Sequence, residues 1–127
     1  MLPFAITLQS GQPVSEQVVY AVKRAVVAGQ LRPGDAFPSV RALSQELRIN
    51  PNTAHKIVAA LTAEGLLEVR PGIGTLVAEA PAASREQRRQ FLSDEVEALV
   101  VEARKYGLEL DDVQEAVVKQ WKRLEGK

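Results

Sequence analysis

Apolar residues recur at helical spacing in three segments of the first half of the chain. The first segment predicts a helix that begins with Ser15 as its N-cap and ends at Gly29. A shorter helix is expected after Ser39, and a third from Pro51 to about Glu64. The positions expected to face a common core are Val18, Val22, Ala25, Val26, Val40, Leu43, Leu47, Ala54, Ile57, Val58 and Leu61.

The turn before the third helix carries the sharpest local signal. Proline is best tolerated at the first position of a helix, because an N–H there would have no intrahelical acceptor. Pro51 therefore marks a helix start, and the side chain of Asn50 can accept the free N–H groups of the first turn. Two short helices joined by three or four residues are typical of a helix-turn-helix.

Two short strands are predicted after the third helix. Leu66, Leu67 and Val69 begin one strand, the loop Pro71–Gly74 reverses the chain, and Thr75–Val77 forms the returning strand. Phe4–Leu8 is expected to form a further short edge strand. Because a two-stranded hairpin is not stable alone, it must pack on the helices. The predicted fold class is mostly α with a small β-hairpin, a winged helix-turn-helix over residues 1–78.

A different pattern begins after Val77. Residues 78–83 are typical of a linker, and Ser84 and Gln87 form a capping-box signature that opens a new helix. Apolar residues at steps of three and four continue to Gly107, and a last helix follows, with acids at its start and bases toward its end. Residues 79–127 are therefore predicted to form a linker and a C-terminal αα-hairpin.

The apolar faces of this hairpin exceed what two helices can bury against each other. A second copy of the chain is the favoured partner, so the tail is expected to form a homodimer. A monomer whose tail folds back on the first domain is the alternative. The expected dimerisation residues are Leu92, Val96, Leu99, Ala103, Val113, Val117 and Trp121.

Composition narrows the function classes only slightly. The 127 residues have a formal net charge of zero, and they include no cysteine for a disulfide, a thiolate metal site or a nucleophile. Residues 1–78 hold seven bases and five acids, and the remainder holds nine bases and eleven acids. No apolar stretch approaches the ~20 residues of a membrane span. Without a signal-peptide pattern either, a cytoplasmic protein with no membrane partner is expected.

The start of the third helix carries the candidate chemistry. In a helix-turn-helix the N-terminal residues of the second helix reach base edges, while the first helix crosses the backbone. Asn pairs with adenine, Thr with a base or a thymine methyl, and Lys with guanine or phosphate. Arg41, near the start of the preceding helix, is placed for guanine or phosphate. The residues expected to face DNA at the start of the third helix are Asn52, Thr53, His55 and Lys56.

Each of these residues also has a simpler interpretation. Asn52 and Thr53 could serve only as helix caps, and Arg41 could be a solvated helix residue. His55 has no cysteine or carboxylate at ligand spacing, so a metal site is not expected. The acids near residue 110 are explained by helix-end electrostatics.

The run from Leu31 to Val77 closely resembles the DNA-binding domain of the GntR family of bacterial transcription regulators. The matching pieces are Leu31–Asp35, Pro38–Arg41, Asn50–Thr53, Glu64–Leu66 and Gly72–Val77. The resemblance implies a winged helix-turn-helix whose DNA contacts come from Arg41, Asn52, Thr53, His55 and the wing residue Gly72. The short tail is similar to that of the YtrA-type subgroup, whose members are associated with transporter operons. Ile73 departs from the family, because the wing often holds a base there.

These observations favour a sequence-specific DNA-binding regulator. It is expected to be a dimeric repressor of a pseudo-palindromic operator, with transporter genes as its target by resemblance. The alternative is a non-enzymatic winged-helix module that contacts protein or RNA, which the near-neutral charge favours. An enzyme is not expected, because no nucleophile with a base, carboxylate pair or ligand cluster is evident. No cofactor is expected, and a small-molecule effector stays open and unidentified.

Overall fold

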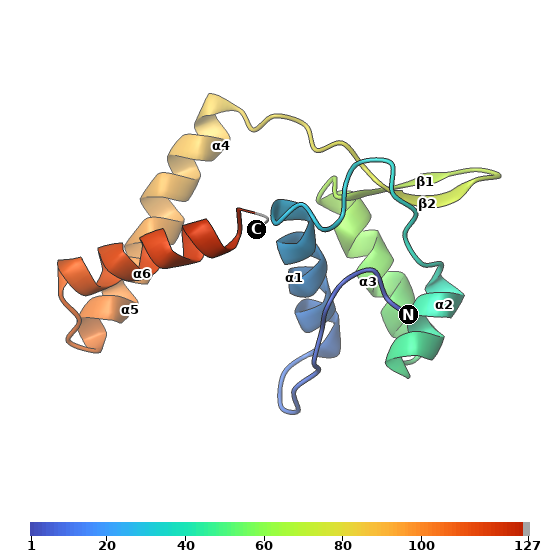
Figure 1. Cartoon of the computed structure of the whole chain (residues 1–127), viewed down its shortest axis with the longest axis horizontal. Helices are drawn as coiled ribbons and strands as arrows, with labels where there is room; N and C mark the ends of the chain where they lie inside the picture. The colour runs from blue at the N-terminus through green and yellow to red at the C-terminus, as the bar shows by residue number, and fades with distance from the viewer. Residues whose placement is uncertain (126–127) are drawn as a thin grey trace. The chain divides into compact units, whose positions relative to one another are not determined.

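The computed structural model describes residues 1–125 and divides the chain into two compact units, residues 1–80 and 81–125 (Figure 1). Unit 1 contains three helices and a two-stranded antiparallel sheet. Its elements are α1 (Val14–Val27), α2 (Val40–Leu47), α3 (Pro51–Ala63), β1 (Leu67–Arg70) and β2 (Gly74–Val77). The mostly helical fold class with one small hairpin is thus confirmed.

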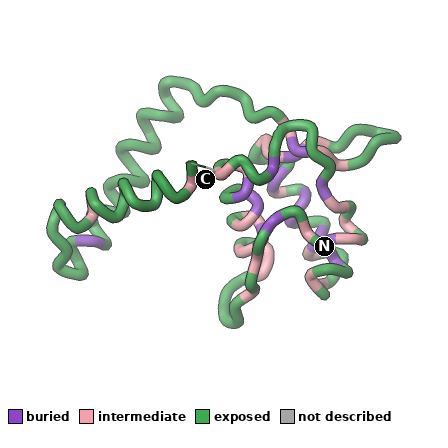
Figure 2. The backbone as a smooth tube through the Cα atoms, viewed as in Figure 1, coloured by how far each residue is buried: buried purple, intermediate pink, exposed green. Residues whose placement is uncertain are grey.

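Helix α3 is the centre of unit 1, since it packs against α1, α2 and β1. Its predicted inner residues Ala54, Ile57, Val58 and Leu61 are all buried. Most of the buried residues of the chain lie in this unit (Figure 2). The four buried residues of α3 form one cluster with nine others: Phe4, Val18, Val22, Ala25, Leu31, Phe37, Leu43, Leu67 and Val77. The core therefore fixes which face of α3 points outward.

The predicted helix boundaries of α2 and α3 are confirmed by their caps. The hydroxyl of Ser39 accepts the N–H of Ala42 at 3.1 Å, and the side chain of Asn50 accepts the N–H of Asn52 at 2.7 Å. Arg48, Ile49 and Asn50 separate the two helices, the three-residue turn of a helix-turn-helix. The outward face of α3 is therefore held by a capped, short connection to α2.

Two predictions for the N-terminal part are wrong. Ser15 is not an N-cap: α1 begins at Val14, and its N-cap residue is Pro13, which makes no side-chain cap. Phe4–Leu8 is not an edge strand, and the backbone just after it, at Gln9, is held by the side-chain amide of Gln17. This amide accepts the N–H of Gln9 at 2.8 Å and donates to its carbonyl at 2.9 Å. Phe4 is buried and stacks on Phe37, with ring centroids 5.9 Å apart.

Unit 2 consists of a long helix and a second helix after a turn. The long helix comprises α4 (Arg85–Gln90), a π-helical segment η1 (Phe91–Glu95) and α5 (Val96–Lys105), and α6 spans Leu110–Arg123. The capping box of Ser84 and Gln87 is present, as predicted. Gly107, at φ +74°, follows the end of α5. The N–H of Glu109 donates to the carboxylate of Asp112 at 2.9 Å, so these acids lie at the start of α6, where helix-end electrostatics favours them.

The π-helical segment was not predicted, and it changes the face that the tail presents. Hydrogen bonds from i to i+5 add a residue to the turn, so the spacing of three and four residues is interrupted there. Leu92 lies inside this segment, and Val96 directly follows it.

Within residues 1–125 no helix is both long and apolar enough to cross a membrane.

Candidate nucleic-acid interface

The first two turns of α3 have a polar outer face and a buried, apolar inner face. Asn52, His55 and Lys56 are exposed and Thr53 is half-buried. Ala54 and Ile57, which alternate with them along the helix, are fully buried. The side chains that can read bases are therefore turned outward by the packing of their neighbours. This is the arrangement in which the second helix of a helix-turn-helix enters the major groove.

Arg41 lies in the first turn of α2 and is exposed. Among the residues that the structure describes, its guanidinium has no ion-pair partner within 4.0 Å. A free guanidinium offers paired donors to guanine or to a phosphate. The structure thus places Arg41 on α2, the helix before α3, and leaves its guanidinium without an ion-pair partner.

The local charge around α2 and α3 is more favourable to DNA than the charge of the whole chain. Glu46 is the only acidic residue between residues 36 and 63, and it forms an ion pair with the N-terminal ammonium of Met1. The same segment holds Arg41, Arg48 and Lys56. This segment therefore holds three bases and one acid, and that acid is already paired, although the whole chain is neutral.

Sequence reasoning missed Arg48. This residue ends α2 with φ +56° and ψ +50°, a left-handed conformation that residues other than glycine seldom adopt. Its neighbour Ile49 packs against the core, and its own side chain is exposed. The turn thereby places an additional base directly before the recognition helix. The signal in the sequence was a base inside a turn too short to bury it.

The wing presents glycine and apolar side chains at its tip. Gly72 has φ +79°, and a Cβ added there would meet nothing within 4 Å. Its backbone is therefore open to a ligand, and a side chain would strain the turn. Ile73 is 68% exposed, and the nearest base, Arg70, is engaged by Glu68 at 2.6 Å. The wing tip accordingly offers a close backbone approach and little positive charge.

The tail contains an apolar groove between α5 and α6 of unit 2. Its volume is about 720 Å³, within the range of small-ligand clefts, and its walls expose almost only carbon. Five of the seven expected dimerisation residues line it, and Leu92 and Val96 do not. Of the five, Ala103 is buried within the tail itself, whereas Trp121 is 71% exposed. The five residues are Leu99, Ala103, Val113, Val117 and Trp121.

Comparison with known proteins agrees with this arrangement. The profile of the family described as bacterial regulatory proteins, gntR family, matches residues 14–77. The HTH-type transcriptional repressor YtrA of Bacillus subtilis is 32% identical over 108 residues, which are 84% of this chain and 83% of that protein.

Solved structures share the fold. A Listeria monocytogenes EGD-e protein described as a transcriptional antiterminator has a TM-score of 0.84 at 22% identity, covering 98% of this chain and 93% of that one. The DNA-binding domain of AraR, solved in complex with operator ORX1, has a TM-score of 0.52 at 25% identity, covering 58% and 95%. The chain therefore belongs to the GntR family of bacterial regulatory proteins and is a non-enzymatic, DNA-binding transcription regulator.

Proposed function

We propose that the protein is a sequence-specific repressor that binds a pseudo-palindromic operator as a homodimer. The observation that carries this proposal is the outward surface of α3, where Asn52, His55 and Lys56 are exposed on a helix whose inner face is buried. Arg41, Thr53 and Gly72 complete the proposed contact set. The operator complex of AraR supports an operator as the ligand, and the name of YtrA supports repression.

The proposed division of labour follows the two compact units. Residues 1–78 read the DNA, and residues 79–127 form a linker and the dimerisation tail. Half-sites in such operators lie about one helical turn, ~34 Å, apart and are related by a twofold axis. The apolar groove of the tail supports a twofold partner, since a self-complementary face is what a dimer of identical chains requires.

The regulated locus and the signal are proposed from the resemblance to YtrA-type regulators. We expect a transporter operon near the gene of this protein. The effector, if one binds, is a small molecule whose identity nothing in the tail specifies.

Replacing Arg41 with alanine tests the DNA-reading surface. A guanidinium that contacts guanine or phosphate contributes about 1–3 kcal/mol, so the affinity for the operator should fall by about 5- to 150-fold. The measurement is fluorescence anisotropy on a duplex that the wild-type protein selects from a random pool. Affinity should also fall steeply with salt, because binding releases counterions from the DNA.

The matched control for this variant is Arg24→Ala. Arg24 is also exposed, but it lies near the end of α1 and lines a groove with the N-terminal segment rather than the α3 surface. The Arg24→Ala substitution removes the same charge from the same unit and should change operator affinity far less. Equal losses for the two variants would contradict a specific role of Arg41. Failure of the wild type to select any duplex would favour a protein- or RNA-binding module instead.

Replacing Ile73 with lysine tests the weak wing. Ile73 is exposed at the wing tip, so a longer side chain there meets no core residue. A phosphate contact from the new ammonium should strengthen binding to all sequences and steepen the dependence of log K on log salt by about one. Salt titrations of the operator and of an unrelated duplex measure both effects. An unchanged salt dependence would show that the wing tip does not approach the DNA.

A further inference from the structure

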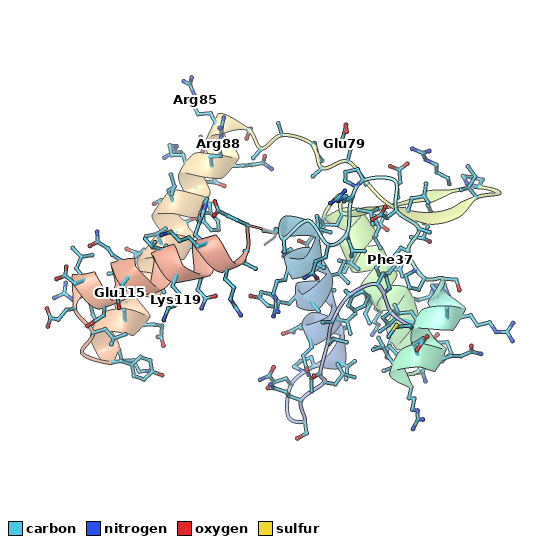
Figure 3. All side chains as sticks on the ribbon, viewed as in Figure 1. Phe37, Glu79, Arg85, Arg88, Glu115 and Lys119 are labelled. Carbon is cyan, nitrogen blue, oxygen red and sulfur yellow. The ribbon has the colours of Figure 1, made fainter. Side chains whose placement is uncertain are left out.

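The first helix of the tail carries a cluster of arginines that the proposed DNA-reading surface does not include. Arg85, Arg88 and Arg89 lie three and four residues apart on α4 and therefore share one face. All three are exposed, and Figure 3 shows Arg85 and Arg88 at the start of this helix. Arg89 is paired with Glu86. Within residues 1–125, Arg85 and Arg88 have no acid in ion-pair distance.

These positions are unfavourable for arginine on the grounds of helix stability. The N-terminus of a helix carries a partial positive charge, which repels a cation in the first turn, where Arg85 lies. Like charges three and four residues apart destabilise the helix further. At the other end of the same hairpin the rule is obeyed, because Lys122 and Arg123 lie in the last turn of α6. A cluster that opposes the local preference is typical of a functional site.

The charge of the tail is divided sharply along its sequence. Residues 84–90 hold three bases and one acid, whereas residues 91–125 hold five bases and nine acids.

The linker is short, since only residues 79–84 separate Ala78 from Arg85, and the N–H of Ala78 is bonded to the carbonyl of Leu66 in unit 1. A fully extended chain of this length spans about 25 Å, less than one turn of duplex DNA at ~34 Å.

We propose that Arg85 and Arg88 bind the phosphate backbone of the duplex that flanks the half-site held by α3. This inference rests on the proposed operator function and extends it to a second contact from the tail. It accounts for arginines where helix electrostatics disfavours them, because a phosphate supplies the missing negative charge. It also supplies the phosphate contact that the wing tip lacks at Ile73. Such contacts strengthen binding without reading sequence.

The test replaces both residues with glutamine, a good helix former without charge. The matched control is Lys119→Gln with Lys122→Gln, which removes the same charge from α6. Each protein is titrated with two duplexes that carry the selected operator, one limited to its core and one extended by ten base pairs on each side. Salt is varied for each pair.

On the extended duplex the Arg85→Gln, Arg88→Gln protein should bind at least about tenfold more weakly at 0.15 M salt. Its salt dependence should fall by about two per protomer, as two lost phosphate contacts require. On the core duplex it should match the wild type, and the preference for the operator over unrelated DNA should not change. Its melting temperature should equal or exceed that of the wild type, since a repulsive cluster is removed.

Several results would overturn the proposal. One is an Arg85→Gln, Arg88→Gln protein that binds the extended duplex with the same affinity and salt dependence as the wild type. Another is an equal loss of affinity in the Lys119→Gln, Lys122→Gln control. A change of oligomeric state without a change in salt dependence would show that the arginines pair with acids of a second copy. A wild-type protein that selects no duplex from the random pool would instead contradict the operator function itself.

Discussion

In the proposed homodimer, Val117→Glu is expected to release a monomer of 13.9 kDa and to lower the affinity for the proposed palindromic operator by about 100-fold or more. Val117 lines the apolar groove of the tail and is 45% exposed in the single chain. A carboxylate there is hydrated in the monomer, so the tail should still fold. In a dimer that buries the groove, the same carboxylate would lose its water without gaining a partner, which is strongly unfavourable.

The loss of DNA binding follows from the loss of linkage between two readers. Once one half-site is bound, a linked second domain meets the other half-site at a high effective concentration, and this raises affinity by 10²–10⁴. A monomer keeps the contacts of one half-site only. Sedimentation velocity gives the oligomeric state, and anisotropy on the full operator and on one half-site gives the two affinities.

The neighbouring residue offers a closely matched control. Val118 is 51% exposed on the same helix and does not line the groove. Val118→Glu adds the same charge one position away, on a different face, and should leave the dimer and the operator affinity nearly unchanged. If both variants become monomers, the interface is broader than the groove. If both stay dimeric, the groove is not the interface.

Unit 1 could be predicted from the sequence because its signals are local and agree with one another. Ser39, Asn50 and Pro51 act on the first turn of the helix that each one starts, and the spacing of Ala54, Ile57 and Leu61 requires only the period of a helix. The structure confirms each of these features. The proposed DNA surface follows from the same pattern, since positions that are not buried on α3 must face outward.

The predictions that failed depended on backbone hydrogen bonding that the pattern of residue types does not show. The segment Phe4–Leu8 alternates like a strand, but it finds no strand to pair with, and the chain directly after it is bound at Gln9 by the side chain of Gln17. Helix α1 begins before Ser15, because the carbonyl of Pro13 already accepts the N–H of Gln17 at 3.2 Å. The π-helical segment was missed because a spacing of three and four residues assumes an uninterrupted α-helix.

Ile57→Ala is expected to lower the free energy of unfolding of unit 1 by about 2–5 kcal/mol, a large share of the stability of a small domain. Ile57 is fully buried on α3 within the core cluster of unit 1, and the change leaves a cavity there. Urea titration followed by far-ultraviolet circular dichroism measures the loss. Trp121, the only tryptophan, lies in unit 2, so its fluorescence reports the tail separately.

Lys56→Ala, one position earlier on the same helix, is the matched control and should give the opposite pattern. Lys56 is exposed, so its loss should change the free energy of unfolding by less than about 0.5 kcal/mol. It should instead weaken operator binding and reduce the salt dependence by about one. Ile57→Ala should bind the operator normally wherever it is folded. A shift of the Trp121 transition in Ile57→Ala as large as that of the whole protein would show that the two units unfold as one.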